Sequence, residues 1–150
     1  MKTRTYLSIF ILLVAVLVLF AGKKISIEDT YGTWVNADYN EKGQMAKEID
    51  HPDGTYDRYP KLTDTEPTWI AEKTITGSWY DEEGNLWVKC TYFFEEERSS
   101  FQYEEGSLLT YYGVYKFSDS GKIRESVWSV QGYPDEMSPI AGNYAIHYRQ

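Results

Sequence analysis

Short runs of alternating apolar and polar residues fill the chain from residue 33 onward, and most of them end at a turn signal. Pro52-Asp53-Gly54 is the clearest of these turns, because proline presets φ and glycine accepts a positive φ. No window in this part sustains the i, i+3, i+4, i+7 apolar spacing of an amphipathic helix. The pattern therefore predicts an antiparallel all-β meander, which at this length closes into a barrel or a sandwich.

The turn signals divide the chain into about eight strands without an internal repeat. The predicted strands are Thr33–Tyr39, Gln44–His51, Thr55–Tyr59, Trp69–Tyr80, Leu86–Phe94, Leu108–Phe117, Ile123–Gln131 and Asn143–Arg149. Phe101–Tyr103 fits either a further short strand or a packed loop. Lys61–Pro67 and Tyr133–Gly142 are expected to be loops. The predicted fold is all-β, an eight-stranded antiparallel up-and-down barrel that follows an N-terminal apolar helix.

The N-terminal run Tyr6–Phe20 is apolar apart from one serine, follows two basic residues and ends in Ala21-Gly22. This arrangement is typical of a secretory signal peptide, and an uncleaved membrane anchor is the alternative. Lys23 stands where a bacterial lipoprotein has its lipid-bearing cysteine, which argues against lipidation. We expect residues 1–22 to be a signal peptide or anchor, 23–30 a tether and 31–150 the barrel domain. The barrel is then exported to the periplasm, the cell surface or the medium, and is tethered to the membrane if the segment is uncleaved.

The charge of the exported part limits which partners it can bind, and its cysteine content limits which covalent cross-links it can form. The whole chain has a formal net charge of −8, and residues 23–150 carry 13 basic and 23 acidic residues, a net charge of −10. Such a balance argues against nucleic acids and anionic membrane surfaces as partners. Cys90 is the only cysteine, so an intrachain disulfide is impossible, and its strand position predicts a buried thiol. We expect a monomer.

No catalytic or metal-binding pattern stands out. The two histidines, His51 and His147, are far apart in the sequence and are expected at the surface or the rim. A glycosidase would need paired carboxylates on strands, where Glu72 and Glu125 are the only fair candidates, and Glu72 is expected to face water. Nucleophile-elbow, P-loop and dinucleotide motifs are missing. The sequence therefore predicts a protein that is not an enzyme, with no catalytic residues, no metal and no cofactor.

The segment Gly32-Thr33-Trp34 matches the Gly-x-Trp motif that opens the first strand of lipocalins. The hairpin segments 84–89 and 121–129 also look like those of bacterial lipocalin-like proteins. The chain thus resembles a lipocalin-like, calycin-type β-barrel over residues 31–149, with a truncated relative or another calycin-like barrel as alternatives. The resemblance implies that Trp34 plugs the closed end of the barrel. It also implies that an arginine stacks on that ring, with Arg149 as the first candidate and Arg124 as the second.

Aromatic residues make up 17% of the chain and concentrate in the predicted strands. Tyrosine and tryptophan combine a large apolar surface with one polar tip, which suits a hollow interior better than a solid core. The predicted barrel lining is Trp69, Trp87, Tyr111, Tyr115, Tyr144 and Tyr148. We expect an exported binding module that holds a small apolar or amphipathic ligand in this barrel. The alternative is a filled barrel that acts as a structural or protein-interaction component of the cell envelope, and an enzyme ranks third.

Overall fold

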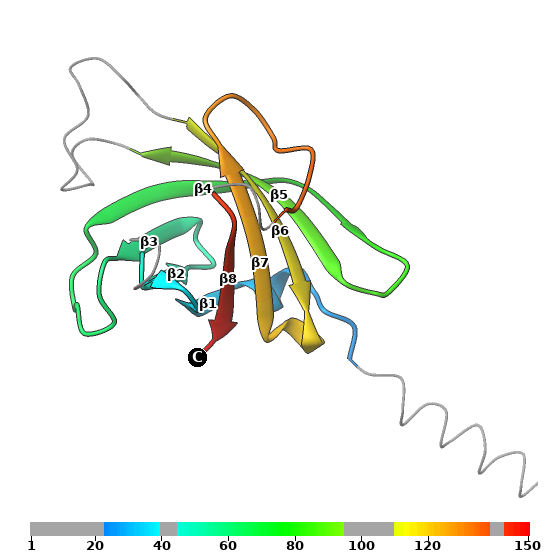
Figure 1. The fold of residues 1–150 in the computed structure, drawn as a ribbon, viewed down its shortest axis with the longest axis horizontal. Helices are drawn as coiled ribbons and strands as arrows, with labels where there is room; N and C mark the ends of the chain where they lie inside the picture. Colours follow the sequence, from blue (N-terminus) through cyan, green and yellow to red (C-terminus); the bar gives the residue numbers. More distant parts are fainter. Residues whose placement is uncertain (1–22, 40–44, 95–109, 139–142) are drawn as a thin grey trace, which may run out of the picture.

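The computed structural model describes residues 23–39, 45–94, 110–138 and 143–150. In these residues the chain forms a closed barrel of eight antiparallel strands in sequence order, β1 to β8 (Figure 1). The predicted all-β up-and-down barrel is therefore confirmed. The predicted signal peptide or anchor, residues 1–22, and the possible strand at Phe101–Tyr103 lie outside the described residues. Within the described ranges, no helix is long and apolar enough to cross a membrane.

Each strand pairs with the next one along the chain, and β1 pairs with β8 to close the barrel. The strands are β1 Gly32–Asn36, β2 Lys47–Asp50, β3 Thr55–Tyr59, β4 Trp69–Tyr80, β5 Leu86–Phe94, β6 Thr110–Ser118, β7 Ile123–Ser129 and β8 Ala145–Arg149. Closure leaves no unpaired sheet edge in the described barrel.

Alternation along the strands builds the core on the inner face of the barrel. In β5, the residues Leu86, Val88, Cys90, Tyr92 and Phe94 are buried, and the residues between them are more exposed. This period of two is the geometry of a pleated strand with one face packed inward. The burial of Cys90 that the sequence predicts is therefore confirmed.

Several strands are shorter than the sequence pattern predicts, because polar side chains turn the backbone at their ends. The first strand ends at Asn36, whose side-chain oxygen accepts a hydrogen bond of 2.9 Å from the Asp38 amide. The seventh ends at Ser129, whose hydroxyl accepts one of 3.0 Å from the Gln131 amide. Serine and asparagine commonly bend the chain in this way.

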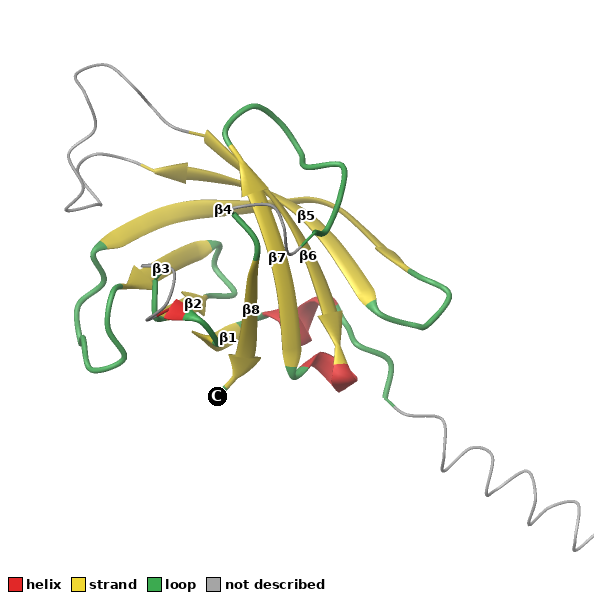
Figure 2. Cartoon of the chain, viewed as in Figure 1, coloured by secondary structure: helices red, strands yellow, loops and turns green. Residues whose placement is uncertain are grey.

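The segment predicted as a tether is packed against one end of the barrel. It contains the 3-10 helix η1 (Ile27–Thr30), and a second one, η3 (Asp119–Gly121), lies beside it (Figure 2). Ile25 is buried in the core, and its carbonyl accepts a hydrogen bond of 2.6 Å from the Tyr80 hydroxyl. Residues 25–30 thus belong structurally to the barrel, and they cover this end.

Candidate functional site

Four aromatic residues come together at the end of the barrel opposite η1. Trp69 opens β4, Phe94 ends β5, and Tyr111 and Trp128 lie next to the start of β6 and the end of β7. Because neighbouring strands run antiparallel, these four positions share one end. We call them the aromatic mouth. Their rings are linked edge to face, with centroid distances of 5.2–5.3 Å between successive partners.

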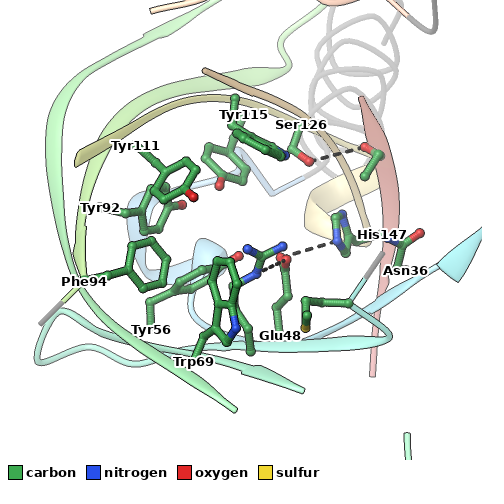
Figure 3. Close-up of a pocket in the computed structure, with 14 residues that line it drawn as sticks. Asn36, Glu48, Tyr56, Trp69, Tyr92, Phe94, Tyr111, Tyr115, Ser126 and His147 are labelled. Atoms are coloured by element: carbon green, nitrogen blue, oxygen red, sulfur yellow. Dashed lines mark hydrogen bonds and ion pairs between the residues drawn. The ribbon is translucent and has the colours of Figure 1, made fainter. Parts of the chain in front are cut away.

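A cavity of about 310 Å³ extends from the aromatic mouth into the barrel (Figure 3). This volume lies at the lower end of the range of small-molecule sites. Its lining mixes aromatic rings with a few polar groups. The lining residues are Asn36, Met45, Glu48, Tyr56, Arg58, Trp69, Tyr92, Phe94, Tyr111, Tyr115, Ser126, Trp128, Ala145 and His147.

Three of the six residues predicted to line the barrel do so. Trp69 and Tyr111 belong to the aromatic mouth, and Tyr115 lies deeper in the cavity. Their participation in ligand binding stays a prediction.

The other three predicted lining residues lie outside the barrel interior, and Tyr144 precedes β8. Trp87 alternates with the buried side of β5 and stacks on Trp79, with a centroid distance of 5.7 Å. Tyr144 packs on the outer cluster of Val114 and Val127, and Tyr148 is half exposed. The interior positions of β8 hold the smaller side chains Ala145 and His147 instead. Because β5 carries large aromatic residues on both faces, aromatic character alone could not select its inner face.

Trp34, the predicted plug, is fully buried beside the covered end of the barrel. Its indole nitrogen donates a hydrogen bond of 3.0 Å to the Thr30 carbonyl of η1. Both candidate arginines lie near its ring, with Arg124 Cζ at 5.0 Å and Arg149 Cζ at 5.9 Å from the centroid. Arg149, ranked first in the sequence analysis, is the more distant, and its guanidinium also binds the carbonyls of Asp29 and Tyr31.

A group of ion pairs lies between Trp34 and the cavity. Arg124, which is fully buried, donates hydrogen bonds to Glu48 and, at 2.9 Å, to Asp50. Lys73 donates a hydrogen bond to Asp50, and Arg58 Nε donates one of 3.2 Å to Glu48. We call these five residues the inner network. Buried charges of this kind are tolerated only when they are paired and hydrogen-bonded.

The sequence analysis missed the carboxylates of the inner network. It weighed Glu72 and Glu125 as strand carboxylates, whereas the buried pair is Glu48 and Asp50 on β2. The structure confirms that Glu72 is exposed. One signal was present in the sequence, since the β2 face carrying Glu48 and Asp50 also carries Ala46. Without knowledge of the basic partners on β3, β4 and β7, that face looks like a solvated one.

His147 is buried inside the barrel, so its predicted place at the surface or rim is wrong. The cause is the register of β8 with β7, which pairs His147 with Arg124 and turns both side chains inward. His51, in contrast, is partly exposed and lies 2.9 Å from Asp57. Burial and the positive charge of Arg124 lower the pKa of His147 to about 3, so its imidazole is neutral at pH 7.

Glu48 is ionised beside this neutral imidazole. Burial by itself would raise the pKa of Glu48, but the guanidinium groups of Arg124 and Arg58 that face it hold this pKa well below its usual range. The His147 Nε2 atom lies 3.3 Å from a Glu48 oxygen. This contact is not a hydrogen bond, and neither ring nitrogen makes one with the described residues.

These titrating groups are poorly suited to acid–base chemistry near pH 7, for which a catalytic pKa close to the operating pH is best. The pKa values of His147 and Glu48 are both too low. Burial raises the pKa of the Cys90 thiol, which keeps it from acting as a thiolate nucleophile. Among the described residues, no group of three histidine, cysteine or acidic side chains is placed to hold a metal ion.

Gly113 provides space for the tyrosines at the boundary between cavity and network. A Cβ atom added there would lie 2.6 Å from a Tyr115 ring carbon and 3.0 Å from a Tyr92 ring carbon. Contacts this short force a side chain to move. The missing side chain on β6 thus leaves room for both rings.

The chain was compared with protein-family models, with curated proteins and with solved structures, and none of these comparisons gave a match.

Proposed function

We propose that this protein binds a small apolar or amphipathic molecule inside the barrel without chemically changing it. The cavity of about 310 Å³ beneath the aromatic mouth is the observation that carries the proposal. A filled barrel, the alternative weighed from the sequence, would leave no such space. The mouth supplies apolar surface whose burial contributes roughly 25 cal/mol per Å² before the entropic costs of binding.

The polar groups deeper in the cavity support an orienting role. Binding sites for small molecules combine an apolar wall with a few fixed polar groups that select and orient the ligand. Here Glu48 and Arg58 hold each other in place. A ligand with one polar end matches this arrangement.

We also propose that the protein is related to the lipocalins and that it is exported. A closed antiparallel barrel with eight strands is consistent with a calycin-like fold, and Trp34 in its Gly-x-Trp motif supports a lipocalin-like protein. The apolar segment at residues 1–22 supports export, with or without continued attachment to the membrane.

The proposal is tested by native mass spectrometry of the protein recovered from its own host, followed by organic extraction. We expect a reproducible co-purifying small molecule whose removal changes the tryptophan fluorescence, because Trp69 and Trp128 line the cavity. An apo mass that stays unchanged after exposure to a panel of lipophilic compounds would contradict it.

A second candidate function, a protein-interaction surface, rests on the outer face of β4 and β5. Trp79 and Trp87 stack there with an angle of 16° between their planes, and Trp79 is 42% exposed. Lys89 lies 5.8 Å from the Trp79 ring, and Lys116 lies 5.8 Å from the Trp87 ring. Tryptophan is enriched at protein–protein interfaces and among the residues that contribute most to their affinity. Loss of a captured partner on Trp79→Ser substitution would support this candidate.

A further inference from the structure

The inner network carries an unbalanced positive charge. It contains three basic residues, Arg58, Lys73 and Arg124, and two acidic ones, Glu48 and Asp50. The side chains of four of them are at most 6% exposed, and that of Arg58 is 18% exposed. This surplus of one positive charge stands inside a protein whose formal net charge is −8. A charge held away from water is costly unless a counter-charge is present.

The other titratable side chains near the network do not supply the missing negative charge. Burial raises the pKa of Cys90, so its thiol stays protonated. Burial likewise raises the pKa values of Tyr56, Tyr92 and Tyr115 above their ordinary value. His147 is neutral and adds no charge of either sign. None of these described side chains therefore supplies a counter-charge to the network.

Donors without partners line the cavity where that counter-charge is missing. Within the described residues, Arg58 uses only Nε in a hydrogen bond, and its two terminal nitrogens make none. The Tyr92 hydroxyl lies near Cys90 and Tyr115 but is buried without a partner in hydrogen-bond geometry. Both residues line the cavity, and so does His147, whose ring nitrogens make no hydrogen bond although Nε2 lies 3.3 Å from a Glu48 oxygen. Native proteins rarely leave buried donors unsatisfied without a functional reason.

We propose that the ligand is a carboxylate with an apolar tail, and that its head enters first to reach Arg58 and Tyr92. This inference rests on the proposed binding function and specifies its ligand class. One carboxylate supplies the single negative charge that the network lacks, and its two oxygens match the terminal nitrogens of a guanidinium. The tail then lies against the aromatic mouth. The guanidinium group of Arg58 already lies beside the mouth, with its Cζ atom 5.2 Å from the centre of the Trp69 ring.

The size of the cavity restricts the tail to a short one. At roughly 30 Å³ for a water-sized group, 310 Å³ holds about ten such groups. Octanoate, with about ten non-hydrogen atoms, is therefore a suitable probe. Octanol and octylammonium share its chain and carry a neutral or a positive head, so they separate the head-group charge from apolar burial.

The test is calorimetric titration of the full chain at pH 7 with these three compounds. We expect octanoate to bind about tenfold or more tightly than octanol, since hydrogen bonds to charged groups are the stronger ones. Octylammonium should bind most weakly. Equal affinities for octanoate and octanol would overturn the carboxylate inference and leave the binding function standing. A preference for octylammonium would also overturn it, and binding of none of the three would overturn both proposals.

Two variants locate the head group. Arg58→Gln should reduce octanoate affinity to the level of octanol, whereas Arg149→Gln, at the covered end of the barrel, should leave it unchanged. Tyr92→Phe keeps the ring and removes only the unpartnered hydroxyl. It should weaken octanoate binding several-fold without lowering the unfolding temperature, so the test holds even if Arg58→Gln fails to fold. Full octanoate affinity in Tyr92→Phe and in a folded Arg58→Gln would contradict the assignment.

Discussion

The two ends of the barrel interior use the same alternating strands for opposite purposes. Towards the covered end, the inner network fills the space between Trp34 and the cavity with paired charges. At the other end, the aromatic mouth surrounds an open volume with rings that contact one another. Charges that compensate one another require close contact, whereas aromatic rings can line a space without filling it. We therefore expect substitutions in the inner network to affect stability most, and substitutions at the aromatic mouth to affect the proposed ligand binding most.

Among these substitutions, removal of the Arg124 guanidinium should reduce stability most. Arg124→Met would leave Glu48 and Asp50 without their shared partner inside the barrel. We expect a loss of about 3–5 kcal/mol in the free energy of unfolding, as for other broken buried ion pairs. Urea unfolding measures the loss, with Arg149→Gln as the matched control. A loss below about 1 kcal/mol would show that the network contributes little to stability.

A larger side chain at Gly113, between the inner network and the cavity, should cause the second-largest loss of stability. In Gly113→Ala the added methyl group would lie 2.6 Å from the Tyr115 ring, so we expect destabilisation by about 1–3 kcal/mol. Gly77→Ala is the matched control, because a Cβ atom there meets nothing within 4 Å. Thermal unfolding compares the two variants. Equal stability of both would mean that the tyrosine rings are not held against β6.

The buried histidine makes the stability of the network pH-dependent. The pKa of His147 falls from 6.5 to about 3 in the folded barrel, so between these values the unfolded chain binds a proton that the folded chain excludes. Stability therefore falls as the pH decreases below 6.5, by about 2 kcal/mol between pH 6.5 and pH 5.

The Glu48 carboxylate adds to the same trend at lower pH. Its folded pKa lies below the ordinary 4.5, so its contribution is present above pH 4.5 and is lost as the pH falls further. The measurement is urea unfolding at pH 7, 6 and 5. His147→Gln should remove most of the slope in this range, and His51→Gln should retain it. A slope that persists in His147→Gln would contradict the assignment.

The smallest effect on stability is expected at the aromatic mouth. Trp128 is 38% exposed, so Trp128→Ala should reduce the free energy of unfolding by less than about 1 kcal/mol, in contrast to Arg124→Met. It should nevertheless weaken octanoate binding, because the ring lines the cavity. Paired unfolding and calorimetric measurements test both statements. A large stability loss with unchanged binding would reverse the roles assigned to the two ends.

The sequence predicted the mouth better than it predicted the network, for a physical reason. In β5, one face is consistently apolar, so alternation alone identified Cys90 as buried and the strand as part of a barrel wall. Trp69 and Tyr111 were placed in the lining by their strand positions and aromatic character. Trp87 and Tyr148 were placed wrongly, because aromatic character does not tell which face of a strand is inside. In β5 large rings occupy both faces, and in β8 the tyrosine lies outside while the smaller Ala145 and His147 lie inside.

The network depends on contacts between strands that are distant in the sequence. Glu48 and Arg124 are 76 positions apart in the sequence. Neither residue can be predicted to lie inside the barrel until its partner is known. A rule that places apolar residues inside assigns Glu48 to solvent and His147 to the rim. Pairing across the barrel reverses both assignments, since a charge that finds its partner can be buried.

The most direct test of the division between the two ends is the orientation of bound octanoate, measured by intermolecular nuclear Overhauser contacts. We predict that the protons next to the carboxylate contact the Tyr92 and His147 rings, and that the terminal methyl group contacts Trp69 and Trp128. The reverse orientation, or contacts confined to Trp79 and Trp87 on the outer face, would contradict the account.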